Sequence, residues 1–222
     1  MKVCIPITET TVAKALGVIK EANPVADLIE LRVDYLRTMD LEPLLNGRER
    51  PFIVTNRRRK EGGKYRGDER ERILILREGL DQGPEYVDVE IRTERRLLQD
   101  LIANKKQTLV VLSFHDFHET PSQRKLRKIC DQMIQFGADV AKIVTFARSW
   151  EDNLKILSLI PYARKRKQAV VAFCMGEKGK MSRIFAPQMG AAWTYASLDK
   201  KRISAPGQLT ALELKDIWRR FR

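Results

Sequence analysis

One lysine inside an apolar segment is the residue of this sequence with the clearest chemical potential. Lys142 lies within residues 140–145, where small and β-branched side chains predict a buried strand. Burial away from water favours the neutral amine, which can attack a ketone and condense with it. A lone lysine in a strand can also lie at a sheet edge or carry its charged end to solvent. Its neighbours decide between these two interpretations.

The only two histidines of the chain follow the preceding apolar segment. Residues 108–114 predict a strand, His115 comes directly after it, and His118 lies three positions further on. An imidazole can accept and return a proton at working pH, because its unperturbed pKa is about 6.5. His118 is the alternative to His115, and the strand period of two gives the two rings different orientations. A buried lysine beside an imidazole predicts imine chemistry coupled to proton transfer.

Short apolar segments recur along the chain with amphipathic patterns between them. Apolar residues at spacings of three and four, as in Val12, Leu16 and Ile19, predict helices between the strands. Alternation of strand and helix favours a parallel sheet, and eight such units close into a (β/α)8 TIM barrel. We therefore expect one catalytic domain over residues 1–222. The expected strands are residues 3–7, 28–33, 52–55, 86–90, 109–114, 140–145, 169–174 and 193–197.

An open, doubly wound sheet is the structural alternative to the barrel. Polar residues end or interrupt many of the expected strands, as Glu30, Arg57, Glu90 and His115 do, and a barrel would bring them to one mouth. An open sheet would concentrate them at one crevice beside a Gly-rich phosphate turn, and the sequence has no such motif. Two polar loops, residues 59–68 and 199–208, are expected to be mobile and able to cover the mouth.

Composition narrows the class of protein. The chain has 222 residues, a net charge of +13 and three cysteines without Cys-x-x-Cys spacing, so neither a disulfide framework nor a zinc ribbon is supported. No apolar stretch approaches the length of a membrane span, and we expect a cytoplasmic protein that binds no membrane. The basic residues are scattered and are expected to lie mostly on solvated helix faces. Without a recognition helix or interleaved aromatic residues, we expect no nucleic-acid partner.

Six motifs in order along the chain resemble the type I 3-dehydroquinate dehydratase family, a family of (β/α)8 enzymes of the shikimate pathway. Each motif lies in or just after an expected strand, and together they cover nearly the whole chain. The resemblance implies a lyase that converts 3-dehydroquinate to 3-dehydroshikimate without a metal or cofactor, and it implies a homodimer. The motifs are residues 30–34 (ELRVD), 55–57 (TNR) with 61–63 (EGG), 113–117 (SFHDF), 141–143 (AKI), 175–183 (MGEKGKMSR) and 204–208 (SAPGQ).

The resemblance implies catalytic roles for three residues. Lys142 would form a Schiff base with the C3 ketone, because a protonated imine makes the neighbouring C2 proton acidic enough to remove. His115, at the family's spacing from Lys142, would take that proton and return one to the departing C1 hydroxyl. Glu61 would hold the histidine in its useful tautomer and raise its basicity.

The resemblance also implies a set of substrate contacts. A guanidinium matches a carboxylate with two parallel hydrogen bonds, and this role falls to Arg183. Ser204 and Gln208 would close over the bound ring as part of a lid. Arg58 adjoins Arg57, so either could face the substrate. The expected substrate-binding residues are Glu30, Arg32, Arg57, Arg183, Ser204 and Gln208.

Two other functions and one departure from the family remain open at this point. A class I aldolase also needs a strand lysine, but it would carry a phosphate site after strands seven and eight, where residues 175–179 are bulky. A basic nucleic-acid-binding domain is the alternative from a different class. Asn56 stands where family members often carry an aromatic or other apolar residue, and it could alter the floor of the pocket.

Overall fold

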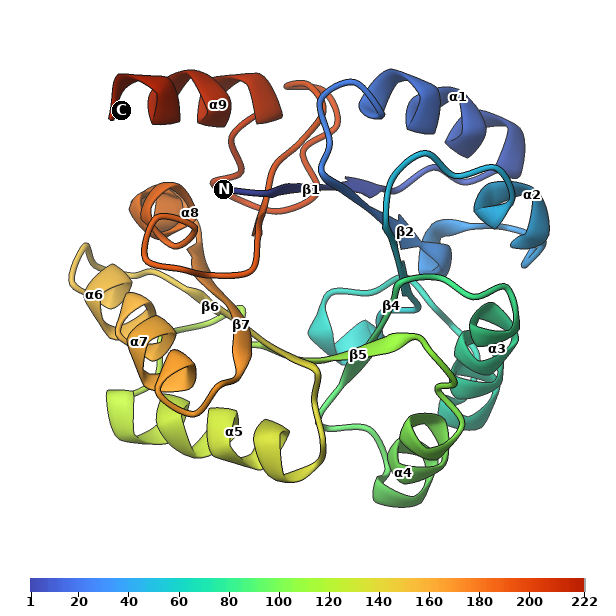
Figure 1. The fold of residues 1–222 in the computed structure, drawn as a ribbon, viewed down its shortest axis with the longest axis horizontal. Coiled ribbons are helices and arrows are strands. Elements are labelled where there is room, and N and C mark those ends of the chain that lie inside the picture. Colours follow the sequence, from blue (N-terminus) through green and yellow to red (C-terminus); the bar gives the residue numbers. More distant parts are fainter. Residues whose placement is uncertain (222) are drawn as a thin grey trace.

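The computed structural model describes residues 1–221, and Arg222, the last residue of the expected domain, lies outside them. Eight strands alternate with helices, and Figure 1 shows the helices as an outer ring around the strands. The strands are β1 (Val3–Ile7), β2 (Leu28–Arg32), β3 (Phe52–Thr55), β4 (Tyr86–Glu90), β5 (Leu109–His115), β6 (Val140–Phe146), β7 (Ala169–Met175) and β8 (Thr194–Tyr195).

All strand pairs are parallel, and they follow the order β7-β6-β5-β4-β3-β2-β1-β8. The remaining gap between β7 and β8 is bridged just before β8, where the amide of Ala192 donates to the carbonyl of Val170 at 2.8 Å. The eight strands therefore form a nearly closed barrel. The predicted (β/α)8 fold is confirmed, and the open doubly wound alternative is wrong.

Four of the helices begin at residues whose side chains cap free backbone amides: Thr11, Asp68, Ser122 and Thr210. Asp68 and Glu71 form a capping box at the start of α3, and Thr210 and Glu213 form another at α9. The helices are α1 (Val12–Ala22), α2 (Glu42–Leu45), α3 (Glu69–Asp81), α4 (Arg95–Ala103), α5 (Gln123–Gln135), α6 (Asp152–Leu157), α7 (Leu159–Arg164), α8 (Lys180–Phe185) and α9 (Ala211–Arg220), with short 3-10 turns η1 (Val33–Tyr35), η2 (Arg59–Glu61) and η3 (Glu177–Gly179).

Alternation along the strands separates two apolar cores. One face of each strand packs outward against the helices, and the other face fills the inside of the barrel with a smaller cluster that includes Cys4, Val111 and Trp193. On β6 the inward residues are Val140, Lys142 and Val144. The barrel interior thus carries apolar side chains at one end and Lys142 further toward the carboxyl ends of the strands.

The last unit differs from the expected strand 193–197. Only Thr194 and Tyr195 pair with β1, because the chain then turns and Ser197 bridges to Thr210 instead. The loop of residues 199–208 is held against the end of β7, where the amide of Gly176 donates to the carbonyl of Pro206 at 3.0 Å. Gly207 has φ +71°, and a Cβ there would lie 2.1 Å from the Gly176 oxygen, so only glycine fits.

No helix among residues 1–221 has both the length and the apolar composition that crossing a bilayer requires.

Candidate active site

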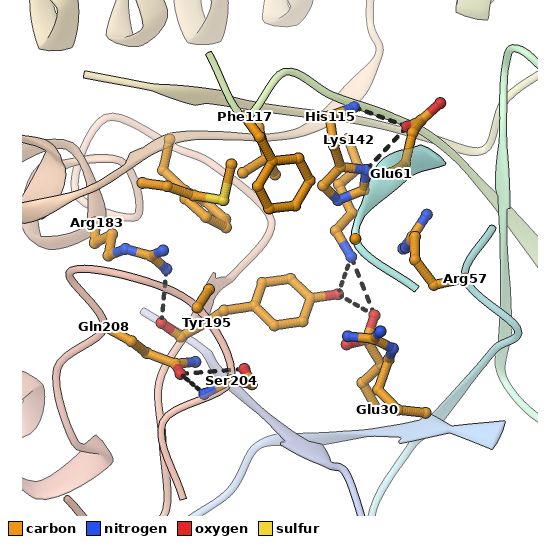
Figure 2. A pocket seen from close by; sticks show the side chains of 16 residues that line it. Glu30, Arg57, Glu61, His115, Phe117, Lys142, Arg183, Tyr195, Ser204 and Gln208 are labelled. Carbon is orange, nitrogen blue, oxygen red and sulfur yellow. Dashed lines mark hydrogen bonds and ion pairs between the residues drawn. The ribbon is translucent and has the colours of Figure 1, made fainter. Parts of the chain in front are cut away.

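A cavity opens at the carboxyl ends of the strands and holds about 580 Å³ of empty space, counted out to its mouth. All nine predicted site residues line it, although they come from segments far apart in the sequence (Figure 2). They are Glu30, Arg32, Arg57, Glu61, His115, Lys142, Arg183, Ser204 and Gln208.

The amine of Lys142 lies inside the barrel among three oxygen partners. Its Nζ is 2.9 Å from Asp88 Oδ2, 3.1 Å from Glu30 Oε1 and 2.8 Å from the hydroxyl of Tyr195 (Figure 2 labels Glu30 and Tyr195). The side chain of Lys142 is 4% exposed, so neither a sheet edge nor a solvated end describes it. Burial of an isolated amine would favour its neutral form, but here the ammonium has two carboxylates to pair with. The amine must therefore hand its proton to a neighbour before it can attack a carbonyl.

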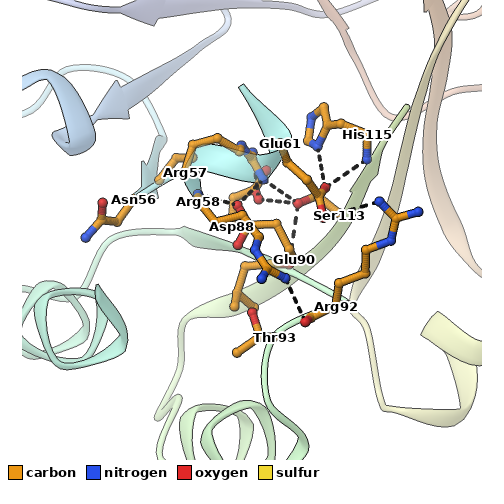
Figure 3. A network of polar contacts seen from close by, with 12 residues as sticks. Asn56, Arg57, Arg58, Glu61, Asp88, Glu90, Arg92, Thr93, Ser113 and His115 are labelled. Atoms are coloured by element: carbon orange, nitrogen blue, oxygen red, sulfur yellow. Dashed lines mark hydrogen bonds and ion pairs between the residues drawn. The ribbon is translucent and has the colours of Figure 1, made fainter. Parts of the chain in front are cut away.

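Asp88 belongs to a buried charge network with Arg57 and Glu90 (Figure 3). Its Oδ1 accepts from Arg57 at 2.8 Å and from the Ser113 hydroxyl at 2.6 Å, while its other oxygen accepts from Lys142. Burial alone would raise the pKa of Asp88, but the charges of Arg57 and Lys142 hold it well below its ordinary value. Asp88 therefore remains an anion and does not take up the lysine proton.

Arg57, rather than Arg58, faces the cavity. Its guanidinium bridges Asp88 and Glu90, with Nη1 at 2.9 Å from Glu90 Oε1, whereas Arg58 turns outward to the carbonyl of Arg92. Glu90 is held in turn from α3, where Arg72 reaches its other oxygen at 2.8 Å. Arg57 is thus fixed in place by carboxylates, and its positive charge faces the interior.

His115 lies at the end of β5 and is held by Glu61. One oxygen of Glu61 accepts from the His115 amide at 2.9 Å and lies 3.2 Å from the ring Nδ1. Burial, together with the charges of Arg57 and Lys142, lowers the pKa of His115 well below its ordinary value. Burial and the nearby Glu90 raise the pKa of Glu61 to about 7. The imidazole is therefore neutral at neutral pH, which is the form that accepts a proton.

The glycines after Glu61 permit this arrangement. Gly62 has φ +81°, and a Cβ there would lie 2.5 Å from the ring of Phe117, which stacks beside His115. A Cβ on Gly63 would lie 1.7 Å from the carbonyl oxygen of Arg57. Glycine at both positions lets η2 approach β3 and β5 closely enough for Glu61 to reach the histidine.

His118, the alternative histidine, does not line the cavity. It is exposed, its amide donates to Asp116 Oδ1 at 2.9 Å, and its carbonyl accepts from Arg148. Asp116 caps this turn and also accepts from the Glu119 amide. The geometry therefore leaves His115 as the imidazole that can act in the cavity.

Arg183, on α8, is a buried cation without an acidic partner among the described residues. It is 1% exposed, and its guanidinium stacks on Phe173 at 4.4 Å and reaches only the carbonyls of Tyr195 at 3.5 Å and Pro206 at 3.4 Å. Its Nε has no partner within the described structure, and burial lowers the pKa of Arg183 to about 10. A buried, unpaired guanidinium that lines a cavity is suited to binding an anion.

The remaining predicted residues frame the mouth. Gln208 Oε1 accepts from the amide of Ser204 at 2.9 Å and from its hydroxyl at 3.1 Å, so these two residues form one rim segment. Arg32 pairs with Asp34 through two nitrogens, each at 2.8 Å from a carboxylate oxygen. Its charge is therefore already matched, unlike that of Arg183.

The sequence analysis missed two side chains that touch Lys142. Asp88 and Tyr195 face the barrel interior. The strand period of two was the signal that could have found Asp88, since Tyr86, Asp88 and Glu90 share one face of β4, whereas β8 is too short for such a signal. Asn56 does not alter the pocket floor as considered. It points toward α3, where its amide donates to the carbonyl of Arg72.

The reactive groups that line the cavity are a lysine amine, a neutral imidazole and an unpaired guanidinium. A carbonyl compound that also carries a carboxylate would match the amine and the guanidinium at the same time. Among residues 1–221, no group of three or more His, Cys, Asp or Glu side chains is placed to hold a metal ion.

Comparisons with known proteins agree with this chemistry. Residues 3–221 match the model of the family described as type I 3-dehydroquinase. Among curated proteins, the 3-dehydroquinate dehydratase of Pyrococcus abyssi is 39% identical over 95% of this chain and 94% of its own, and that of Methanocaldococcus jannaschii is 36% identical over 98% and 97%. The crystal structure of 3-dehydroquinate dehydratase from Geobacillus kaustophilus superimposes with a TM-score of 0.92 at 26% identity, over 99% of this chain and 90% of that one.

Proposed function

Since this chain belongs to the type I 3-dehydroquinase family, whose members are lyases that dehydrate 3-dehydroquinate, we propose that it does so through an imine on Lys142 with His115 as general acid and base. The observation that supports this most is the shared cavity of a buried amine and a buried, unpaired guanidinium. The class I aldolase and the nucleic-acid-binding alternatives receive no support from these comparisons.

The first step is attack of Lys142 on the C3 ketone. Arg57 and Ser113 hold Asp88 as an anion. Glu30 is therefore the carboxylate that receives the lysine proton, since apart from Nζ its Oε1 accepts only from the neutral hydroxyls of Thr55 and Tyr195. Loss of water from the adduct leaves a protonated imine. Its positive charge forms beside Asp88, which is already placed at 2.9 Å from Nζ to stabilise it.

The second step is transfer of the C2 proton to His115. The imine draws electrons from the C2–H bond, and a neutral imidazole is ready to accept the proton because burial lowers the pKa of His115. Glu61 orients the ring through Nδ1, which leaves Nε2 for the substrate. The imidazolium then returns its proton to the C1 hydroxyl, and water departs.

Arg183 binds the substrate carboxylate in this proposal. The anion gives the guanidinium the partner that the protein does not supply, so substrate binding compensates a buried charge. Glu30, Arg32 and Arg57 contact the ring hydroxyls, while Ser204 and Gln208 cover the bound ring. No metal or cofactor takes part in these steps.

A pair of histidine variants tests the proposal. Purified protein with a metal chelator should convert 3-dehydroquinate to the conjugated enone, followed by its ultraviolet absorbance. His115→Asn should lower kcat by about 10³-fold, within the range of general acid–base catalysis. The matched variant His118→Asn should retain the parent rate, because His118 is exposed outside the cavity. Equal losses in both variants, or none in His115→Asn, would contradict the assignment.

We also propose that the chain forms one catalytic domain over residues 1–222 and assembles as a homodimer. A single set of strands carries the cavity, and the family match spans residues 3–221. Sedimentation equilibrium should give twice the chain mass, and a monomer mass at micromolar concentration would overturn the dimer.

A further inference from the structure

Tyr195 places a phenol hydroxyl directly on the amine of Lys142. The hydroxyl accepts a hydrogen bond from Nζ at 2.8 Å and donates one to Glu30 Oε1 at 3.2 Å, as Figure 2 shows. The ring lies under the same amine, with Nζ 4.2 Å from its centroid, and contacts Phe173 at a centroid distance of 5.9 Å. Tyr195 also lines the cavity that holds Lys142.

The hydroxyl is not needed for packing. The ring alone fills its place against Phe173 and under Nζ, and a phenylalanine would fill it equally well. A buried phenol hydroxyl instead requires hydrogen-bond partners, and here both partners belong to the chemical apparatus: the amine of Lys142 and the carboxylate of Glu30. The hydroxyl thus links the nucleophile to its proton acceptor.

Imine formation requires protons to leave the Lys142 nitrogen and to reach the ketone oxygen, two atoms that lie close together in the adduct. The ammonium of Lys142 loses two of its three protons, and the ketone oxygen leaves as water carrying two protons. In the intermediate adduct, nitrogen and departing oxygen are bonded to the same carbon and lie roughly 2.4 Å apart. A hydroxyl at 2.8 Å from Nζ is therefore within reach of that oxygen as well.

We propose that Tyr195 is a further catalytic residue, whose hydroxyl carries protons between Lys142, Glu30 and the oxygen lost from the substrate during imine formation and hydrolysis. This inference rests on the proposed role of Lys142 as nucleophile.

The proposed steps balance. First, Nζ gives a proton to the Tyr195 oxygen while the Tyr195 proton passes to Glu30, which leaves a neutral amine, a neutral phenol and a protonated carboxyl. The amine then adds to the ketone carbon, and a second nitrogen proton moves to the former carbonyl oxygen. Finally, Tyr195 protonates that hydroxyl and recovers a proton from Glu30. The C–O bond then breaks, its electron pair leaves with the oxygen, and water departs. One proton remains on the imine nitrogen, and both acids regain their starting states.

Neither Asp88 nor His115 is placed to carry protons between Lys142 and the departing oxygen. Asp88 also touches Nζ, but Arg57 and Ser113 occupy its other oxygen and keep it ionised. The imidazole of His115 is held by Glu61 at the end of β5. Burial raises the pKa of Tyr195 well above its ordinary value, which keeps the hydroxyl protonated between transfers.

The test isolates imine formation from the later proton transfer. In a His115→Ala background, which blocks the later step, 3-dehydroquinate is mixed with the protein, quenched at intervals with borohydride, and the mass of the trapped adduct is measured. Adding Tyr195→Phe should lower the limiting rate of adduct formation at least about tenfold. The substrate concentration that gives half the limiting rate should change less than twofold, because the ring and the cavity wall are retained.

Tyr86→Phe in the same background is the matched control. Tyr86 faces the opposite end of the barrel interior, where its ring packs on Trp193 at 5.2 Å, and this variant should form the adduct at the background rate. An adduct rate within twofold of the background in the Tyr195→Phe protein would overturn the inference, as would a loss confined to the half-saturating concentration. Failure of the proposed function would look different, since no adduct would then form on Lys142 even with Tyr195 intact. Circular dichroism melting curves confirm that each variant is folded.

Discussion

The two sides of the cavity treat buried positive charge in opposite ways. On the side of β2 to β6, Lys142 and Arg57 are each paired with carboxylates at 3.1 Å or less. On the side of β7 and α8, Arg183 has no carboxylate among the described residues and reaches only two backbone carbonyls. In the proposed function, the paired side moves protons and electrons, whereas the unpaired side is completed by the carboxylate of the substrate.

This difference indicates that, in the proposed function, one side of the cavity carries out the reaction and the other side binds the substrate. Inward residues of the strands meet at fixed registers, so a charge network can be satisfied within the protein before substrate arrives. Arg183 lies on α8 after β7, and the rim pair Ser204 and Gln208 lies in the loop after β8, so these three side chains line the cavity from segments outside the barrel strands. Substitutions on the two sides should therefore differ in their effects on rate, binding and stability.

The largest effect is expected for Lys142→Met. Loss of the nucleophile should lower kcat by at least about 10⁴-fold. Removing the cation that Glu30 and Asp88 share should lower the free energy of unfolding by about 3 kcal/mol, although Asp88 keeps Arg57. Enone absorbance and urea denaturation measure the two quantities. Lys106→Met, in the exposed turn after α4, is the control and should alter neither. A stable Lys142→Met protein would show that the charges of this side are not mutually dependent.

Arg183→Met should affect binding more than stability. We expect kcat/KM to fall by about 10²-fold, chiefly through KM, because the carboxylate contact is lost. Burial lowers the pKa of Arg183 in the folded protein to about 10, below its value in the unfolded chain. The charged guanidinium therefore lowers the free energy of unfolding at every pH below about 10. The free energy of unfolding at pH 7 should therefore stay the same or rise.

Arg72→Met is the matched control for that stability claim. Arg72 is also 1% exposed, but it pairs with Glu69 and Glu90. Its loss should lower the free energy of unfolding by about 3 kcal/mol, since Oε2 of Glu90 then loses its arginine partner and only the contacts on Oε1 remain. Equal destabilisation by the two arginine variants would remove the contrast between the paired and unpaired charges.

Glu61→Gln tests the pH dependence of the paired side. With a pKa raised to about 7, Glu61 is ionised above that pH and protonated below it, and only the ionised form supports the basicity of His115. The parent kcat/KM should therefore fall as pH drops through about 7. The glutamine variant should be about tenfold slower at pH 8 yet nearly independent of pH between 6 and 8. A parent-like acid limb in the variant would place the titrating group elsewhere.

The smallest effect is expected at the rim. Gln208→Ala removes the acceptor that holds Ser204, and a neutral hydrogen bond contributes about 1 kcal/mol. KM should rise about three- to tenfold with kcat within twofold, as measured by initial rates. A loss of kcat as large as that of His115→Asn would move Gln208 into the chemical half of the cavity.

The sequence predicted the fold and the location of the cavity because both follow from local patterns. Short apolar runs separated by helical spacing gave the strands, and the polar residues at their ends converged as a barrel requires. The sequence alone did not reveal which charges pair. Arg72 has the appearance of a solvated residue in a charged helix, and it is buried only because Glu90 and the carbonyl of Asn56 lie opposite it.

Contacts on Lys142 were the other part that local patterns could not supply. Asp88 lies between two valines in β4 and was passed over, although it shares the inward face with Glu90. Tyr195 belongs to a strand of only two residues, too short for a periodic signal. Both contacts depend on the closure of the barrel, which brings β4 and β8 to either side of β6.

Borohydride trapping tests the central claim most directly. The parent protein is incubated with 3-dehydroquinate, reduced with borohydride, digested and analysed by peptide mass spectrometry. The account predicts one ligand bound per chain, on the peptide that contains Lys142, with loss of activity in proportion to labelling. Inactivation without a mass change on Lys142, or a label on another lysine, would contradict it.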